Sequence, residues 1–387
     1  MLMAVCANLC RYRHVQSAAA CATRSLYWGR IHADVPLANG LHPSIYALSA
    51  RQYVQAPETR PVPDERSTAG LQKQEQTEQR PATSYMPVSQ QALSSQPIQT
   101  QPQPPPPQPP TMSDKEARMN MPANVVIPYN IDWIFKRMRC PSRVWWLASQ
   151  FVITAVGIFS KILLMIVNKT RVYNKELLVD LISKRPKGVG LLTVSNHYSC
   201  FDDPGLWGML PLRQVCNSSC IRWSMAAHDI CFTNKYHSIF FMFGKCIPVV
   251  RGYGVYQEAI NLCIEKCATG QWVHVFPEGK VNMEKEELRL KWGVGRIIYD
   301  SPKMPIILPL WHEGMDDVLP NVEPYVPQWR KKVTINIGQP LDLNDFVKEL
   351  KKNQVPEQTA RKLITDKIQD VFRILRTETE QLHRERQ

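Results

Sequence analysis

The stretch LLTVSNHYSCFDDPG, residues 191–205, decides the fold class. Its first four residues form an apolar run typical of a buried β-strand. Pro204 suits the first turn of a helix, with Asp202 or Asp203 near the cap. This passage from strand to helix predicts an α/β protein whose open sheet binds ligands beyond its strand ends. It places His197 at a strand end and Asp202 at a helix start, both beside the same crevice.

His197 and Asp202 have the chemistry of a general base and its orienting partner. An imidazole can accept a proton from an attacking hydroxyl, while a carboxylate holds the correct tautomer and stabilises the imidazolium. The spacing alone is weak support, because it also arises by chance and most single histidines are structural. A covalent route through Cys200, which lies between the two, is a minor alternative because nothing in the sequence indicates an activated thiol.

Later apolar runs are also followed by residues that could bind a phosphate or an oxyanion. FGKCIPVVRG, residues 243–252, carries Arg251, whose guanidinium can bind a phosphodiester with two hydrogen bonds; a surface ion pair is the alternative. WVHVF, residues 272–276, leads into Pro277-Glu278-Gly279-Lys280, a turn whose N–H groups and lysine suit an oxyanion or a phosphate. PIILPL, residues 305–310, is a further predicted strand. His274 and His312, in or after these strands, are expected to be structural.

One apolar segment predicts attachment to a membrane. VWWLASQFVITAVGIFSKILLMIV, residues 144–167, is long enough to span a bilayer and has Lys161 as its one charge. Trp145 and Trp146 suit the membrane interface, and basic residues on both sides leave the orientation open. The segment either spans the bilayer or lies in one leaflet, and a buried core helix is the alternative. Near the C-terminus, apolar residues at helical spacing from Leu363 to Leu375 predict a helix that packs on the domain.

The charge balance points to an anionic partner. Lys and Arg number 47 against 34 Asp and Glu, a net charge of +13, and most of the excess lies after residue 111. The 11 cysteines lack paired CxxC motifs, so free thiols are expected and structural zinc is not. No nucleotide-binding loop, metal-ligand cluster or G-x-S-x-G motif occurs, and no nucleic-acid-binding module is recognisable. We therefore expect no cofactor, no metal and no nucleic acid.

The motifs resemble the glycerolipid acyltransferase family. Asn196-His197-x4-Asp202, Gly244 to Arg251 and Phe276-Pro277-Glu278-Gly279 occur in the family's order. The strings NHYSCFDDPGLWG, WVHVFPEGKVNM and PIILPLWHEGMDDVLPN are similar to one branch, the cardiolipin-remodelling transacylases, and the resemblance covers about residues 121–382. The wider family continues Thr-Arg-x-Ser after the glycine, whereas Lys280-Val281-Asn282 stands here, which weakens any transfer of acyl-CoA contacts.

The resemblance implies a mixed central sheet flanked by helices, with an N-terminal membrane-anchoring helix. It also implies a CoA-independent transfer of acyl chains between phospholipids such as phosphatidylcholine and monolysocardiolipin, which yields cardiolipin. By resemblance His197 is the general base and Asp202 its partner, while Arg251, Glu278 and Gly279 bind substrate; Lys280 is added on chemical grounds. The alternatives are an acyl-CoA-dependent lysophospholipid acyltransferase, of the 1-acylglycerol-phosphate type, and a non-catalytic lipid binder. Oligomeric state stays open.

Four regions are predicted along the chain. Residues 1–33 contain arginines and no acid, which is typical of a mitochondrial presequence, so residues 1–51 are a candidate targeting leader. Residues 52–120 are rich in Pro and Gln and are expected to be a disordered linker. A membrane-anchor segment, 121–175, and the acyltransferase domain, 176–387, complete the chain. Leader and resemblance together predict mitochondrial inner and outer membranes, facing the intermembrane space.

Overall fold

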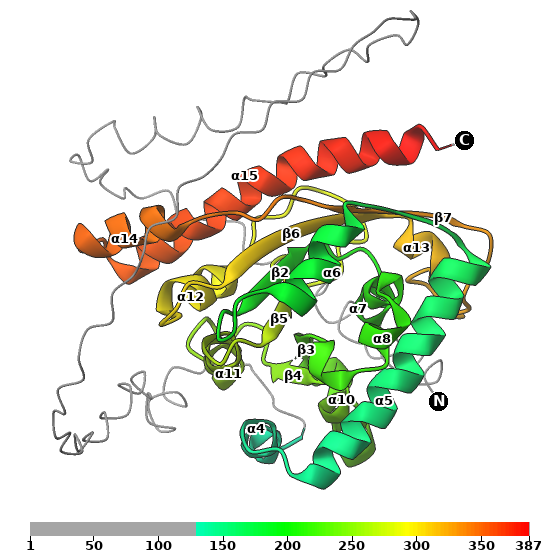
Figure 1. Cartoon of the computed structure of the whole chain (residues 1–387), viewed down its shortest axis with the longest axis horizontal. Coiled ribbons are helices and arrows are strands. Elements are labelled where there is room, and N and C mark those ends of the chain that lie inside the picture. The colour runs from blue at the N-terminus through cyan, green and yellow to red at the C-terminus, as the bar shows by residue number, and fades with distance from the viewer. Residues whose placement is uncertain (1–128, 387) are drawn as a thin grey trace, which may run out of the picture. The chain divides into compact units, whose positions relative to one another are not determined.

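The computed structural model describes residues 129–386. The predicted leader (1–51), the predicted linker (52–120) and residues 121–128 of the predicted anchor segment lie outside these residues. The described chain forms a seven-stranded sheet in the order β1-β7-β6-β2-β5-β3-β4, with helices packed against it (Figure 1). The strands are β1 (Lys169–Tyr173), β2 (Leu191–Ser195), β3 (Trp223–Ala227), β4 (Cys246–Val249), β5 (Trp272–Val275), β6 (Ile306–Glu313) and β7 (Lys332–Ile337).

Fifteen helical elements accompany these strands in the described part of the chain. Those before the middle of the sheet are α4 (Asp132–Arg139), α5 (Arg143–Lys161), the π-helix η1 (Ile162–Val167), α6 (Lys175–Lys184), α7 (Asp202–Gly205), the 3₁₀-helix η2 (Leu206–Met209), α8 (Leu212–Val215), the 3₁₀-helix η3 (Ser218–Cys220), α9 (His228–Cys231) and α10 (Lys235–Phe243). The later ones are α11 (Glu258–Ala268), α12 (Gly293–Asp300), α13 (Met315–Val318), α14 (Asn344–Lys352) and α15 (Glu357–Arg384).

The directions of the strands favour a ligand-binding site at one edge of the sheet. Strands β2 to β6 are parallel to one another. Strand β7 is antiparallel to β6, and β1 is parallel to β7, so the predicted mixed sheet is confirmed. The register places Thr193 beside His274 and Ser195 beside Leu310. Because the parallel strands end at the same edge, the residues that follow them converge there.

The sheet has a hydrophobic core on each face, because successive strand side chains point to opposite faces. Leu192 and Val194 of β2 join one core with α4, α11, α12, α14 and α15. Leu191 faces the other core, which contains residues of α5, η1, α6 and η2. The predicted C-terminal helix is confirmed as α15, whose Ile364, Ile368, Phe372 and Leu375 are buried.

Helix α5 and η1 form the predicted apolar segment, which lies along the domain with one face packed against it. Trp145 stacks on Trp223 of β3, with ring centroids 5.9 Å apart. The Ser149 hydroxyl donates to the carbonyl oxygen of Phe243 over 2.7 Å. The Lys161 ammonium donates to the carbonyl oxygens of Gly208 and Leu210. These contacts hold the helix along its length.

The other face of α5 and η1 is apolar and exposed. Leu147 and Phe151 are 72% and 76% exposed, and Ile166 is 75% exposed. By length and composition Arg143–Val167 is the one helix among the described residues that could cross a membrane. β1 follows it at once, within the segment predicted as the anchor, so the anchor segment and the sheet overlap in sequence.

Candidate active site

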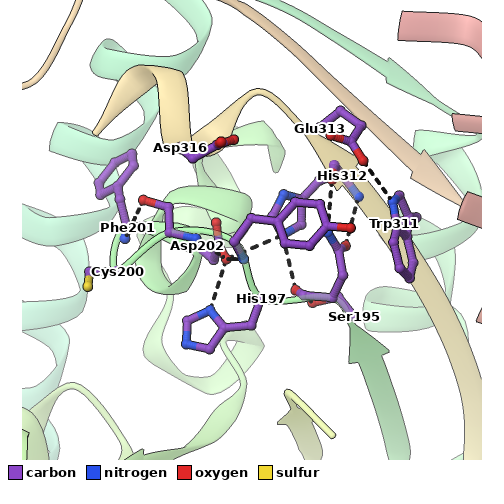
Figure 2. A network of polar contacts seen from close by, with 12 residues as sticks. Ser195, His197, Cys200, Phe201, Asp202, Trp311, His312, Glu313 and Asp316 are labelled. Carbon is purple, nitrogen blue, oxygen red and sulfur yellow. Dashed lines mark hydrogen bonds and ion pairs between the residues drawn. The ribbon is translucent and has the colours of Figure 1, made fainter. Parts of the chain in front are cut away.

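The predicted catalytic pair lies at the carboxyl edge of the sheet. His197 follows β2, and Asp202 begins α7. The Nδ1 atom of His197 is 2.9 Å from Oδ2 of Asp202. Figure 2 shows one nitrogen of the His197 ring reaching Asp202, while the other nitrogen points away from the network. The His197 side chain is 20% exposed and that of Asp202 is 0% exposed, so a substrate can reach only the histidine.

Backbone donors fix the carboxylate of Asp202. The N–H groups of Tyr198 and Ser199 donate to the same Oδ2 atom, over 2.7 and 2.9 Å. Burial alone would raise the pKa of Asp202, but the charge of His312 and the hydrogen bonds from both histidines outweigh it and hold this pKa below its usual range. An ionised carboxylate acts only as an acceptor, so Nδ1 of His197 carries a proton and Nε2 presents a lone pair.

A second histidine, which was expected to be structural, also contacts Asp202. Nε2 of buried His312 is 3.5 Å from Oδ2 of Asp202 and 3.1 Å from the carbonyl oxygen of Asn196. The Asn196 side-chain amide forms two hydrogen bonds with the His312 backbone. Its oxygen accepts the His312 N–H over 3.0 Å, and its nitrogen donates to the His312 carbonyl oxygen over 2.9 Å. Burial opposes a charge on His312, yet the nearby Asp202 carboxylate raises its pKa. No sequence signal revealed this contact, which depends on the pairing of Ser195 with Leu310, two residues before His197 and His312.

The turn after β5 holds His197 from its backbone. Oε1 of Glu278 accepts the His197 N–H over 3.2 Å, and the Asn282 N–H donates to the His197 carbonyl oxygen over 2.6 Å. The Phe276 ring stacks on the imidazole, with centroids 4.1 Å apart and an interplanar angle of 19°. Gly279 has φ of +72°, a backbone conformation that favours glycine. The turn therefore sets both the position and the ring plane of His197.

Glu278 is buried beside the histidine, and burial raises the pKa of its carboxyl to about 7. Its observed contact is with the protein backbone, so its predicted role in binding substrate stays a prediction. Gly279 lies in the exposed part of the same turn, and its predicted substrate contact also stays a prediction.

The two predicted cationic groups lie outside the buried network. Arg251 follows β4 and forms an ion pair with Asp229, with its own side chain 33% exposed. The Lys280 side chain is exposed in the turn after β5. Both residues follow strands that end at the same edge as β2, which is where an anionic headgroup would have to bind if His197 is the base.

The second acid of the Asp202-Asp203 pair has a different environment. Asp203 forms an ion pair with Arg222, and its carboxylate accepts a hydrogen bond from Nε1 of Trp207 over 3.0 Å. The Arg222 and Asp203 side chains are 6% and 12% exposed, and Arg222 also donates to the carbonyl oxygen of Gly244. The pair ties the start of α7 to the segment before β4, a function that the sequence did not reveal.

His274 is the core histidine that was predicted. Its Nδ1 atom lies 2.8 Å from the Thr193 hydroxyl, and its ring packs edge-on against Phe276. Burial lowers its pKa to about 3, so the ring is neutral. Among residues 129–386, no group of three or more His, Cys, Asp or Glu side chains is arranged to hold a metal ion. The arrangement offers a base, its carboxylate and nearby cations.

Comparisons with known proteins identify proteins that this chain is similar to. The sequence signature of the Acyltransferase family matches residues 169–313. A tafazzin of Drosophila melanogaster is 63% identical over 388 residues, which cover 100% of both chains. An N-acylphosphatidylethanolamine synthase of Arabidopsis thaliana is 41% identical over 199 residues, covering 50% of this chain and 70% of that protein. The crystal structure of a 1-acyl-sn-glycerophosphate (LPA) acyltransferase from Thermotoga maritima has 17% identity and a TM-score of 0.39, covering 62% of this chain and 87% of that chain.

Proposed function

The chain belongs to the tafazzin family of acyltransferases, and from that premise we propose that it is a CoA-independent transacylase that moves acyl chains from phospholipids to monolysocardiolipin. The observation that best supports this mechanism is the hydrogen-bonded pair of His197 and Asp202 at an accessible edge of the sheet. Because Nδ1 of His197 donates to Asp202, its Nε2 atom is the base.

The reaction transfers one acyl group and one proton. Nε2 of His197 takes the proton from the free glycerol hydroxyl of the lysolipid, and the resulting oxygen attacks the ester carbonyl carbon of the donor. Asp202 stabilises the imidazolium. The tetrahedral intermediate collapses with cleavage of the donor's C–O bond, and His197 returns the proton to the departing lysolipid oxygen. Since the ester broken and the ester formed are alike, the step is nearly isoenergetic and reversible.

Arg251 and Lys280 are the groups that we assign to the lipid headgroups. A guanidinium suits the two oxygens of a phosphodiester, and an exposed ammonium can neutralise a second phosphate or an oxyanion. Asp229 would then orient the Arg251 guanidinium, to which it is already paired. Glu278 and Gly279 complete the substrate-binding turn in this proposal.

The membrane supplies both substrates, and α5 is the element that we assign to it. Its buried face is bound to the domain, while its apolar face is open, as an in-plane helix requires. We therefore place α5 and η1 in one leaflet. The arginine-containing, acid-free residues 1–33 and the family membership support mitochondrial membranes, inner and outer, with the domain facing the intermembrane space.

The first test uses purified full-length chain on vesicles of labelled phosphatidylcholine and monolysocardiolipin, with no coenzyme A. Label should appear in cardiolipin, and His197→Ala should lower the rate by about 10²–10⁴-fold, the usual contribution of a general base. His237→Ala is the matched control, because this histidine lies on α10 and its Nδ1 atom bonds to the Thr233 hydroxyl over 3.0 Å. Transfer that begins only after acyl-CoA is added would replace this proposal with the CoA-dependent alternative.

A further inference from the structure

Loop 321–331, between α13 and β7, joins the active-site region to the end of the apolar helix. At its start, the Asn321 side chain accepts the Cys200 N–H over 3.2 Å and donates to the Tyr198 carbonyl oxygen over 2.6 Å. The Ser199 hydroxyl donates to the carbonyl oxygen of Leu319, just before the loop, over 3.0 Å. The loop is thus fixed to the three residues that follow His197.

At its far end, the loop is fixed to the last turn of η1 and the start of β1. The Asn168 amide donates to the Gln328 carbonyl oxygen over 3.1 Å, and the Arg330 N–H donates to the Val167 carbonyl oxygen over 3.0 Å. The Lys331 N–H donates to the Asn168 side chain over 2.8 Å. Trp329 therefore lies between Gln328 and Arg330, which are both bonded to the chain at the end of the helix.

The side chains of this loop are unusually apolar for an exposed segment. Trp329 is 67% exposed, Val322 is 65% exposed and Val326 is 47% exposed. Tyr325, by contrast, is buried in the core and holds the loop in place. Exposed apolar side chains that gather in one place mark a binding surface.

This apolar group continues onto the helix and is bordered by cations. Ile166 and Val167, whose chain the loop contacts, are 75% and 38% exposed. Lys169, Arg330 and Lys331 lie next to them in sequence, and Glu323 is the one acidic residue of the loop. We define the Trp329 surface by its apolar and basic members: Ile166, Val167, Val322, Val326, Trp329, Lys169, Arg330 and Lys331.

We infer that the Trp329 surface is a second membrane contact, which binds a bilayer with anionic headgroups. Tryptophan and basic side chains together suit the interface between headgroups and hydrocarbon. Continuity with the apolar face of α5 and η1 means that helix and loop can enter the same leaflet. The inference rests on the proposed function, since a membrane substrate is what makes this contact useful. Through Asn321, the same loop would hold the segment after His197 at the bilayer surface.

The inference is tested by co-sedimentation of the full chain with vesicles that contain no acyl acceptor. Trp329→Ala should weaken binding about tenfold, as expected for losing part of one aromatic side chain's burial. Lys331→Gln should weaken binding only to anionic vesicles, whether the anionic lipid is cardiolipin or phosphatidylglycerol. Ile374→Ala, which removes an apolar side chain that is 53% exposed on α15, is the matched control and should bind as wild type.

Folding and self-association have their own controls. Trp329→Phe keeps an apolar ring and should retain intermediate binding, and circular dichroism should show the same helix content in all variants. Equal binding of wild type, Trp329→Ala and Ile374→Ala would overturn the inference. So would a change of oligomeric state on size exclusion with vesicle binding unchanged, which would assign the surface to contact between copies.

Binding is measured without turnover, so this proposal and the transacylase proposal fail separately. Tight binding that depends on Trp329, with no acyl transfer in any lipid mixture, would leave the membrane contact standing and reject the enzyme function. Full transfer on vesicles by Trp329→Ala with unchanged binding would reject the contact alone.

Discussion

At the residue scale, one carboxylate oxygen of Asp202 accepts three hydrogen bonds, two from backbone N–H groups and one from His197. Asp202→Asn keeps the size of the side chain and an oxygen that faces these three donors, but it removes the negative charge beside the imidazole. The imidazolium that forms when Nε2 takes a proton then lacks an adjacent carboxylate to stabilise it. We expect the transfer rate to fall about 10³-fold or more with little change in stability.

Steady-state transfer rates and melting temperature measure these two effects. Asp300→Asn is the control, because Asp300 lies on α12 and pairs with Arg296 away from the site. A rate close to that of wild type in Asp202→Asn would show that the charge of the carboxylate does not stabilise the imidazolium.

The buried Glu278 predicts a pH dependence of stability. Burial raises the pKa of this carboxyl from 4.5 to about 7, so between these values the unfolded chain loses a proton that the folded chain keeps. Stability is therefore full below pH 4.5 and falls as the pH rises to about 7. Glu278→Gln keeps an oxygen to accept the His197 N–H and has no charge to bury.

Urea unfolding at several pH values should therefore show the free energy of unfolding of Glu278→Gln rising relative to that of wild type between pH 4.5 and about 7. Above this range the difference should reach about 3 kcal/mol. Glu349→Gln, at an exposed position of α14, should show no such trend. Parallel curves for wild type and Glu278→Gln would mean that the carboxyl is solvated.

At the residue scale, the sequence predicted which residues have catalytic chemistry better than it predicted which residues contact one another. His197 and Asp202 were recognised because their types and spacing suit a base and its partner, and the structure brings them within 2.9 Å. His312 was assigned to the scaffold, since only the pairing of β2 with β6 shows that it lies level with this pair. The hydrogen bond from the His197 N–H to Glu278 was not predicted, because a sequence does not reveal which way a buried carboxylate turns.

At the scale of elements, the packing of α5 on η2 depends on a close backbone approach. A Cβ atom at Gly208 would lie 2.7 Å from the carbonyl carbon and oxygen of Ser160, which are backbone atoms and cannot rotate away. Gly208→Ala should therefore separate helix and turn, lowering the free energy of unfolding by about 1–3 kcal/mol.

Denaturant unfolding measures this loss. Gly293→Ala on α12 is the matched control, because its added methyl group would meet only the flexible end of Ile260 at 3.3 Å. An unchanged midpoint in Gly208→Ala would show that α5 is not held this closely.

The sequence predicted α5 from apolar composition and length, but it left open whether the segment spans, lies in one leaflet or is buried. Composition could not separate these, since small or polar residues such as Ser149 and Lys161 lower the apolar character without showing where they point. In the structure both donate to carbonyl oxygens of the domain. The strands β1, β3 and β7 were not predicted, because polar or charged residues such as Arg171, Ser224 and Thr334 interrupt their apolar runs.

At the scale of the whole molecule, the α/β class followed from strand runs that end in polar motifs, and the mixed sheet followed from the family resemblance. The antiparallel β7, which reverses direction after the loop carrying Trp329, depends on contacts distant in sequence. No local pattern specifies such pairing, whereas the parallel β2, β5 and β6 each carry a recognisable motif at their ends. The division into leader, linker and anchor stays a prediction.

The attachment of α5 along one face has a consequence for the lipids themselves. A helix that keeps its bonds to the domain cannot also be surrounded by hydrocarbon, so the proposed placement of α5 in one leaflet would keep the domain and its base with a single monolayer. An exchange catalysed there would equilibrate the acyl chains of that monolayer and leave its opposite unaltered. The two halves of the bilayer would then differ in acyl composition for as long as lipid flip-flop is slower than exchange.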